Sequence, residues 1–215
     1  MEGFTLSRIL INLLIATQWT IILSLIAFVG GGIVGFLVTL MRISSNRWIK
    51  GISRIYVEFF QGTPLLLQLF LAFFGISVVI GVNLSPLQAA TLALTAYTSA
   101  FLGEIWRGAI EAVPKGQWEA GSAIGFGYFK QLQLIILPQA IKLAIAPTVG
   151  FLVQVIKGTS LASIIGFTEL SRAAALINNV TLDSLLIFGL AGLIYFVLCY
   201  PLSTWSQQLE KKFTY

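Results

Sequence analysis

Glu104 is the residue of this chain whose chemistry most needs an explanation, because it lies in Ala93–Ala109, a largely apolar run with the character of a membrane span. A carboxylate in hydrocarbon costs several kcal/mol, so such a group faces a protein interior, a water-filled path or a cation. Two interpretations are open. Glu104 can bind the cationic group of a solute within the membrane, or it can form an ion pair with Arg107 at helical spacing.

Other side chains can complete a binding site around this carboxylate. Phe101 lies three residues before Glu104 and shares its helical face. The hydroxyl groups of Thr63, Thr159 and Ser160 are candidate donors to a solute carboxylate, and Thr63 lies beside a predicted break in a membrane helix. We therefore predict these four residues, together with Glu104, as parts of one substrate site.

The composition places these residues in a polytopic, all-α membrane protein. The chain is 57% hydrophobic and 10% charged, with a mean hydropathy of +0.92. It has no histidine, one cysteine (Cys199) and no paired carboxylates or Ser/Lys couple within a span, so we expect no catalytic residue and no metal site. The net charge of +5 is spread over short connections, which membrane topology explains better than a nucleic-acid partner.

Five apolar segments have the length of membrane spans, and no interval between them can hold a further domain. We therefore predict one domain over residues 1–215. The basic residues concentrate in alternate connections and in the C-terminal tail, which places the N-terminus outside and the C-terminus in the cytoplasm. The predicted spans are Asn12–Met41, Val57–Val82, Gln88–Ala112, Leu132–Ile156 and Leu185–Trp205.

Glycine and proline mark special places in two of these spans. Gly31 and Gly35 have the four-residue spacing that lets two membrane helices approach closely, which favours a packing role over a ligand contact. In the second span, Thr63 and Pro64 are typical of a new helix start, with Thr63 as N-cap and Pro64 as first helical residue. A proline kink in one continuous helix is the alternative. A segment of mixed character, Leu161–Ile177, is expected to be re-entrant or to lie on the outer surface.

A spaced motif follows the third span: Glu119-Ala120-Gly121, three residues, Gly125, nine residues, and then Ile135-Ile136-Leu137-Pro138. It resembles the cytoplasmic signature loop of ABC-importer permeases, although Gly121 replaces the usual second alanine. The resemblance implies a short coupling helix, about residues 117–124, that docks in a groove of an ATPase subunit and transmits its movement to the spans. The residues expected to serve this contact are Lys115, Gln117, Trp118, Glu119, Ala120, Gly121 and Gly125.

Three further stretches are similar to the polar amino acid permeases of that group: Glu58–Leu66, Tyr97–Gly108 and Lys157–Leu161. Gln61 stands where an arginine is common in the family, and we include Gln61 in the expected substrate site. The resemblance implies the type I ABC importer permease fold and a multi-pass place in the bacterial plasma membrane, among its lipids. It also implies three partners: an ATP-binding cassette ATPase that uses ATP and magnesium, a second permease copy or close homologue, and an extracytoplasmic amino acid binding protein.

The resemblance thus predicts the membrane subunit of an ATP-driven importer for a polar amino acid, and the acidic Glu104 gives a lean toward arginine, lysine or histidine. The chain lacks the Gly-x4-Gly-Lys-Ser/Thr phosphate loop, so it is expected to carry no cofactor and to depend on its partner for ATP hydrolysis. A self-sufficient channel or ion-coupled carrier that uses Glu104 is the alternative. Such a protein needs no coupling helix.

Overall fold

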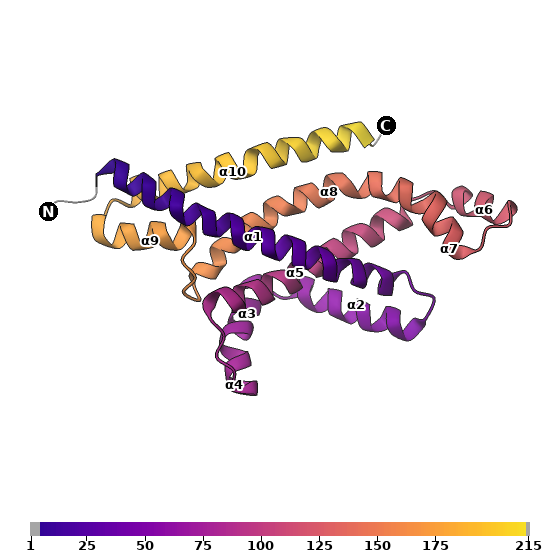
Figure 1. Cartoon of the computed structure of the whole chain (residues 1–215), viewed down its shortest axis with the longest axis horizontal. Coiled ribbons are helices and arrows are strands. Elements are labelled where there is room, and N and C mark those ends of the chain that lie inside the picture. Colours follow the sequence, from indigo (N-terminus) through magenta and orange to yellow (C-terminus); the bar gives the residue numbers. More distant parts are fainter. Residues whose placement is uncertain (1–4, 214–215) are drawn as a thin grey trace.

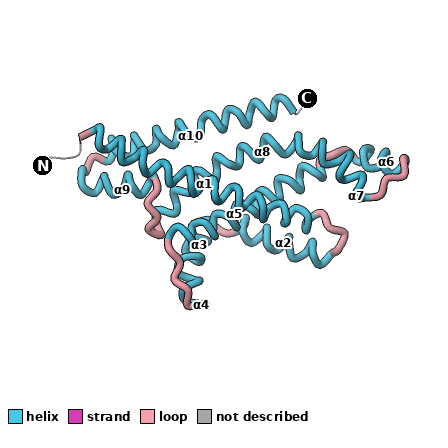
Figure 2. Tube along the Cα trace, viewed as in Figure 1, coloured by secondary structure: helices cyan, strands magenta, loops and turns pink. Residues whose placement is uncertain are grey.

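The computed structural model describes residues 5–213, so the two ends of the predicted domain (1–4 and 214–215) lie outside the described residues. Within that range all regular structure is helical (Figure 2). The elements are α1 (Leu6–Arg42), α2 (Arg47–Gly62), α3 (Leu65–Phe70), the π-helical turn η1 (Leu71–Gly75), α4 (Ile76–Ile80), α5 (Pro86–Glu111), α6 (Lys115–Ala123), α7 (Tyr128–Gln131), the π-helical turn η2 (Leu132–Ile136), α8 (Leu137–Gly158), the 3₁₀ helix η3 (Thr159–Ser163), α9 (Leu170–Thr181) and α10 (Ser184–Phe213).

The helix α5 lies at the centre of the bundle and packs against α1, α2, α3 and α8. Figure 1 shows α10 alongside α8 at one edge and α2 at the other, with α6 and α7 together at one end. The main hydrophobic cluster joins Leu23 of α1, Leu94 and Leu102 of α5, and Phe151 of α8. This central position explains why α5 can hold polar side chains, since its neighbours shield them from lipid.

Small residues bring α1 and α5 into close contact, as the glycine spacing predicted. A Cβ atom on Gly31 would lie 2.5 Å from the Cβ of Thr98, and one on Gly35 would lie 3.0 Å from the carbonyl oxygen of Ser99. A side chain at either position would force the two helices apart. The Thr39 hydroxyl donates a hydrogen bond of 2.8 Å to the carbonyl of Gly35 and lies 3.3 Å from that of Gly103 on α5.

The predicted second span is broken. Between α2 and the α3–α4 segment the chain turns by 104°, and α3 and α4 project from the bundle (Figure 1). The expected N-cap role of Thr63 is wrong, because its hydroxyl donates to the carbonyl of Phe59 and so ends α2. Pro64 precedes the first residue of α3 and has extended backbone angles. Its ring and its missing N–H exclude continuation of α2, so the break is complete.

The helix α2 begins ten residues earlier than the predicted span at Val57. Asn46 caps it and accepts hydrogen bonds from the backbone of Trp48 and Ile49. Arg47, Lys50 and Arg54, predicted to lie in a connection, are therefore on this helix. These basic residues alternate with apolar residues along the helix, so α2 is amphipathic. A basic segment next to an apolar one can therefore belong to a single helix.

Within residues 5–213, three helical segments are long and apolar enough to cross a membrane: α1, Tyr128–Ser163 and α10. The bent pair α2 and α3–α4 gives a fourth if it counts as one span. These segments account for four of the five predicted spans. The fifth predicted span lies in α5, which is 26 residues long but less apolar than α1, α8 and α10. A crossing by α5 stays a prediction.

The segment Leu161–Ile177 is not one helix. It divides into η3 and the beginning of α9, which folds back against α1 and α10. Glu169 stands at the division and is fully buried. Its carboxylate accepts hydrogen bonds from the backbone of Ser171 and Arg172, and the Tyr195 hydroxyl donates to it over 2.8 Å. The N-terminus of α9 therefore supplies the partners that a buried carboxylate needs.

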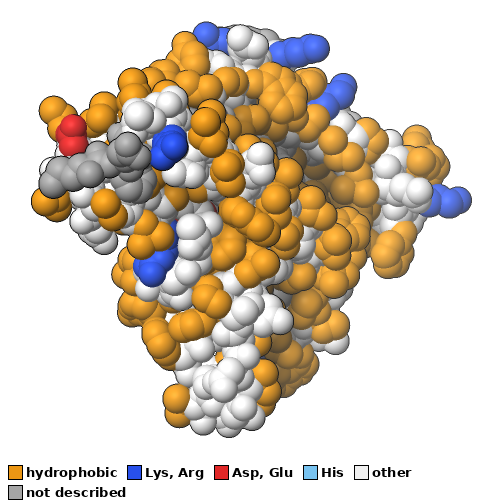
Figure 3. Space-filling view, turned by 60° about the vertical axis from the view of Figure 1, so that its left-hand side comes forward, with side chains coloured by type: hydrophobic (Ala, Val, Ile, Leu, Met, Phe, Trp, Pro, Cys, Tyr) orange, Lys and Arg blue, Asp and Glu red, His pale blue; other side chains and the backbone are white. Residues whose placement is uncertain are grey.

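Hydrophobic side chains dominate the face of the molecule in Figure 3, with Lys and Arg restricted to a few places. Val78 and Val79 on the projecting α4 are 84% and 83% exposed. Soluble proteins rarely expose apolar surface to this extent, so the outer face suits lipid or another membrane subunit.

Candidate functional site

The Glu104 carboxylate forms ion pairs with two arginines. Arg42, the last residue of α1, donates from Nη2 over 3.1 Å, and Arg107 donates from Nε over 3.0 Å and from Nη2. Arg107 also pairs with Glu111. The Glu104–Arg107 pair left open by the sequence is therefore formed. Glu104 lies seven residues before the end of α5, roughly 10 Å along the helix axis.

Arg42 was absent from the residues predicted for the site. Its side chain is only 12% exposed, and its Nε atom is buried without a hydrogen-bond partner among the described residues. Sixty-two positions separate it from Glu104, so no local spacing pairs them. A basic residue at the C-terminal end of a membrane helix was the one available signal, because such a residue also suits the helix dipole.

Gln61 of α2 contacts the part of α5 that carries Phe101. The Gln61 side-chain amide lies 3.3 Å from the carbonyl of Ala100, to which it donates. Phe101 stacks on Phe151 of α8, with ring centroids 5.1 Å apart and planes 14° apart. Phe101 is therefore part of the packing between α5 and α8, while Gln61 is exposed on α2.

Thr63 lies at the break between α2 and α3, where Gln68 holds the chain. The buried Gln68 donates from Nε2 to the carbonyl oxygens of Phe60 and Thr63 and to the Thr63 hydroxyl, over 2.8, 3.1 and 2.9 Å. These bonds satisfy carbonyl groups that the break leaves without helical partners. The sequence interpretation gave Gln68 no role, although its position four residues after Pro64 fits this one.

Thr159 and Ser160 lie at the other break, where α8 becomes η3. Their hydroxyls donate to the carbonyls of Ile156 and Lys157, each over 2.7 Å. This end of α8 meets the start of α3, because a Cβ on Gly158 would lie 3.1 Å from the Leu65 side chain. The structure thus brings the two predicted breaks together, whereas Glu104 is ion-paired with Arg42 and Arg107.

Lys157 is a charged residue at this junction that the sequence interpretation left out of the site. Its exposed side chain borders a groove of about 320 Å³ between α8 and α10, together with Tyr195 and Cys199. Cys199 lies midway along α10. Among residues 5–213 the Lys157 ammonium has no ion pair. Lys157 is the penultimate residue of α8, and a long amine near the end of a membrane helix can extend to the polar interface.

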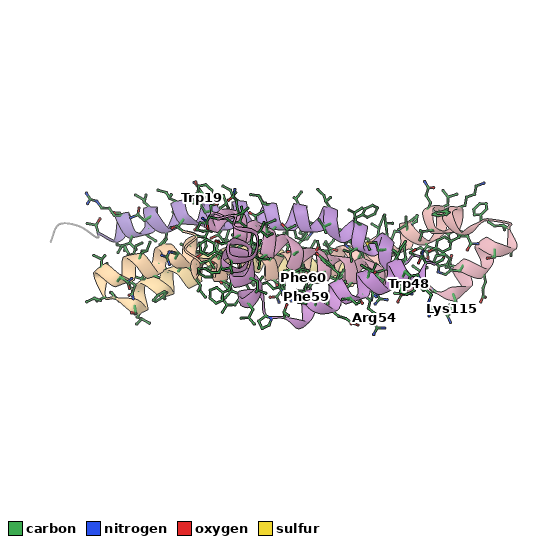
Figure 4. All side chains as sticks on the ribbon, turned by 90° about the horizontal axis from the view of Figure 1, so that it is seen from below. Trp19, Trp48, Arg54, Phe59, Phe60 and Lys115 are labelled. Atoms are coloured by element: carbon green, nitrogen blue, oxygen red, sulfur yellow. The ribbon has the colours of Figure 1, made fainter. Side chains whose placement is uncertain are left out.

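The short helix predicted at about residues 117–124 is observed as α6, at one end of the molecule (Figure 1), and its coupling role stays a prediction. It begins at Lys115, directly after Pro114, two residues earlier than predicted. Figure 4 shows Lys115, Trp48 and Arg54 toward the same end, with Trp19 in the other half. Glu119 and Ala120 are exposed, so a partner can reach both.

Gly121 and Gly125 have roles that differ from the expected ones. Gly121 is the buried residue of α6 and faces the bundle, not the outer surface. Gly125 adopts φ +79°, a left-handed conformation. The backbone N–H of Phe126 bonds to the carbonyl of Gly121, and that of Gly125 bonds to the carbonyl of Ser122, each over 3.0 Å. This is a Schellman C-cap, so Gly125 ends α6.

The sequence of the chain matches one family model over residues 31–215, described as the binding-protein-dependent transport system inner membrane component. The chain belongs to this family. It is a multi-pass membrane subunit of an ABC transporter, and ATP hydrolysis belongs to a separate subunit.

Relatives and a solved structure support this assignment. The probable glutamine ABC transporter permease protein GlnM of Bacillus subtilis (strain 168) is 38% identical over 193 residues, 90% of this chain and 89% of that protein. The L-cystine transport system permease protein TcyB of the same organism is 38% identical over 195 residues, 90% of this chain and 83% of that protein. The crystal structure of an amino acid ABC transporter with histidines superposes with a TM-score of 0.90 at 31% identity, covering 99% of this chain and 100% of that chain. The predicted type I importer permease fold is confirmed.

Proposed function

We propose that this chain is the translocation subunit of an ATP-driven importer for a polar amino acid. It pairs with a second copy or a close homologue, and an extracytoplasmic binding protein delivers the amino acid. The named substrates of the similar proteins, glutamine and cystine, support a polar amino acid. The exposed apolar surface of the isolated chain supports further membrane contacts.

The observation that best supports the proposal is the exposed position of α6. This short helix lies at one end of the bundle, exposes Glu119 and Ala120, and is anchored on its other face. A self-sufficient carrier or channel needs no such helix. The ATPase, which binds ATP and magnesium, docks on the exposed face of α6 and moves the spans through it.

For the substrate site, we favour the junction of the two helix breaks. Lys157, directly before the second break, offers an ammonium for the carboxylate of the amino acid. Thr63 lies at the first break, and Thr159 and Ser160 lie at the second. Each of these hydroxyls donates to a backbone carbonyl, and Thr63 also accepts from Gln68. Thr159 is fully buried, so a substrate reaches it only if the second break rearranges. Glu104, with Gln61 and Phe101, lines the path further along α5.

The lean toward basic amino acids depends on the charge of Glu104. Arg42 and Arg107 already neutralise that charge, so a basic side chain must displace one of the arginines to reach it. The similar amino acid ABC transporter that was solved with histidines supports the lean, whereas the relatives named for glutamine and cystine support neutral substrates.

The decisive experiment reconstitutes the chain with its ATPase and binding protein in proteoliposomes and measures uptake of a panel of polar amino acids. Uptake should require ATP inside and binding protein outside. Uptake that continues at full rate without nucleotide would support the carrier alternative and reject this proposal.

The substrate site has its own test in the same assay. We expect Lys157→Met to lower uptake about tenfold to hundredfold, since a hydrogen-bonded charge contributes about 1.5–3 kcal/mol. Lys142→Met changes an exposed lysine of the same helix and should leave uptake near the wild-type value. Unchanged uptake in Lys157→Met would remove the junction from the proposal, and unchanged uptake in Glu104→Gln would remove Glu104.

A further inference from the structure

The connection between α6 and the following span is rich in glycine, so its backbone is flexible. Residues 124–127 contain Gly125 and Gly127, and this turn is the one covalent path from α6 to α7. If this turn were the only connection, a displacement of α6 would cause rotation about the backbone bonds of the turn and would not move α7. If the spans are to follow α6, side-chain contacts must bypass the turn.

Gln131 supplies such a contact. It is the last residue of α7 and is buried. Its side-chain amide Nε2 donates to the carbonyl of Phe126 over 2.6 Å and to the Ser122 hydroxyl over 3.0 Å. One side chain thus ties the start of the fourth span to the turn and to the last turn of α6.

Gly121 lets α6 lie directly on that side chain. A Cβ on Gly121 would lie 2.8 Å from Gln131 Cγ and 3.0 Å from Ile135 Cδ1. An alanine here therefore cannot keep the present separation unless Gln131 moves. The glycine that replaces the usual alanine is therefore compatible with this close contact.

Contacts at the other end of α6 align with this one. Gln139 donates from Nε2 to Gln117 Oε1 over 3.3 Å. Gln131, Ile135 and Gln139 follow at intervals of four and form a stripe along the start of the fourth span. Trp118 also stacks on Tyr128 of α7, with ring centroids 5.7 Å apart. The stripe holds α6 along its length.

We propose that Gln131 is a positioning residue that locks α6 to the start of the fourth span, so that α6, α7 and the beginning of α8 move as one rigid body. This inference rests on the proposed docking of an ATPase on α6. The same lock carries the movement along α8 toward Gly158, where the two helix breaks meet.

The test uses the reconstituted complex and measures uptake and ATP hydrolysis in the same vesicles. Gln131→Met keeps the length of the side chain but removes both donated hydrogen bonds. We expect the complex to assemble and to hydrolyse ATP, while the amount of amino acid imported per ATP falls about tenfold, because two hydrogen bonds that hold α6 are lost. A wild-type ratio in an assembled Gln131→Met complex would overturn the inference.

The steric half of the lock has a matched pair of variants. Gly121→Ala should lower import per ATP, whereas Gly116→Ala, which meets no atom within 4 Å on the same helix, should not. In Gly121→Ala the added substitution Gln131→Ala removes the closest clashing atoms, so combining the two should cost less than the two single losses together. Strictly additive losses would contradict a direct contact.

A further variant distinguishes failure of the docking proposal from failure of the Gln131 proposal. If no ATPase binds α6, then Glu119→Arg on its exposed face leaves assembly and ATP hydrolysis unchanged. If docking is right and only the lock is wrong, Glu119→Arg weakens assembly while Gln131→Met behaves as wild type.

Discussion

Glu104 pairs with Arg107, which its helical spacing offered, and also with Arg42, which is 62 positions away in the sequence. The carboxylate interrupts an apolar run, and guanidinium groups from two helices neutralise it. The substrate role of Glu104 stays a prediction, and any such role has to compete with these arginines.

Substitution of Glu104 by glutamine should destabilise the protein, because it leaves Arg42 and Arg107 without their shared partner. Since the Glu104 side chain is 30% exposed, solvent screening limits the expected loss to about 1–2 kcal/mol. The thermal unfolding midpoint in detergent measures it. Glu58→Gln, which breaks the exposed pair with Arg54, is the control and should not shift the midpoint. Equal midpoints for both variants would show that the Glu104 pairs contribute no stability.

Gly31 makes a second prediction at the scale of one residue. Gly31→Ala places a methyl group 2.5 Å from the Thr98 side chain, and we expect a loss of about 1–3 kcal/mol from overpacking between α1 and α5. Gly192→Ala in α10 meets no atom within 4 Å and should be neutral or stabilising. The same unfolding assay compares them, and a stable Gly31→Ala protein would mean that the two helices separate freely.

At the scale of elements, the α2–α3 break depends on Gln68. We expect Gln68→Met to lower the free energy of unfolding by about 1–3 kcal/mol, because carbonyl groups of Phe60 and Thr63 lose their donor away from water. Gln154→Met, at an exposed position of α8, serves as the control. An unfolding midpoint equal to wild type in Gln68→Met would show that water reaches the break.

The element α9 gives a pH-dependent prediction through Glu169, which lies in the connection before α9. Burial raises the pKa of this carboxyl above its ordinary value of 4.5, although the hydrogen bonds from Ser171, Tyr195 and Arg172 oppose the shift. A raised folded pKa contributes stability that is fully present below the ordinary value and is lost as pH rises through the folded value. Thermal midpoints measured across this range should therefore decline less with pH in Glu169→Gln than in wild type. The exposed Asp183→Asn is the control, and identical pH profiles for wild type and Glu169→Gln would contradict the prediction.

At the scale of the whole molecule, the positions of the basic residues set an orientation. Arg54 and Lys115 lie toward the end of the molecule that carries α6 (Figure 4), and positive residues favour the cytoplasmic side. We propose that this end is cytoplasmic, that the N-terminus is outside, and that α5 is the fifth span of a single domain.

Cysteine labelling tests this orientation in intact cells. In a Cys199→Ser background, a membrane-impermeant thiol reagent should label Asp183→Cys, in the connection before α10, and should not label Lys130→Cys on α7 until the membrane is permeabilised. Both positions are exposed in the structure, so burial does not explain a difference. The reverse pattern would invert the topology.

The sequence by itself predicted the features that depend on local pattern. Apolar length predicted helical spans, Thr63 and Pro64 predicted a break or a kink in the second span, and the residues after Pro114 predicted a short helix. Each of these features depends on residues that are near one another in the chain. It also predicted that Gly31 and Gly35 pack against another helix, but not which one.

Only the tertiary structure decided which distant groups meet. Arg42 reaches Glu104, Tyr195 reaches Glu169, and Gln131 lies on Gly121, and none of these pairs follows from a helical or strand period. A buried charge or amide takes whichever partner the packing of helices brings within about 3 Å, so its role depends on the relative position of elements that the sequence pattern leaves free.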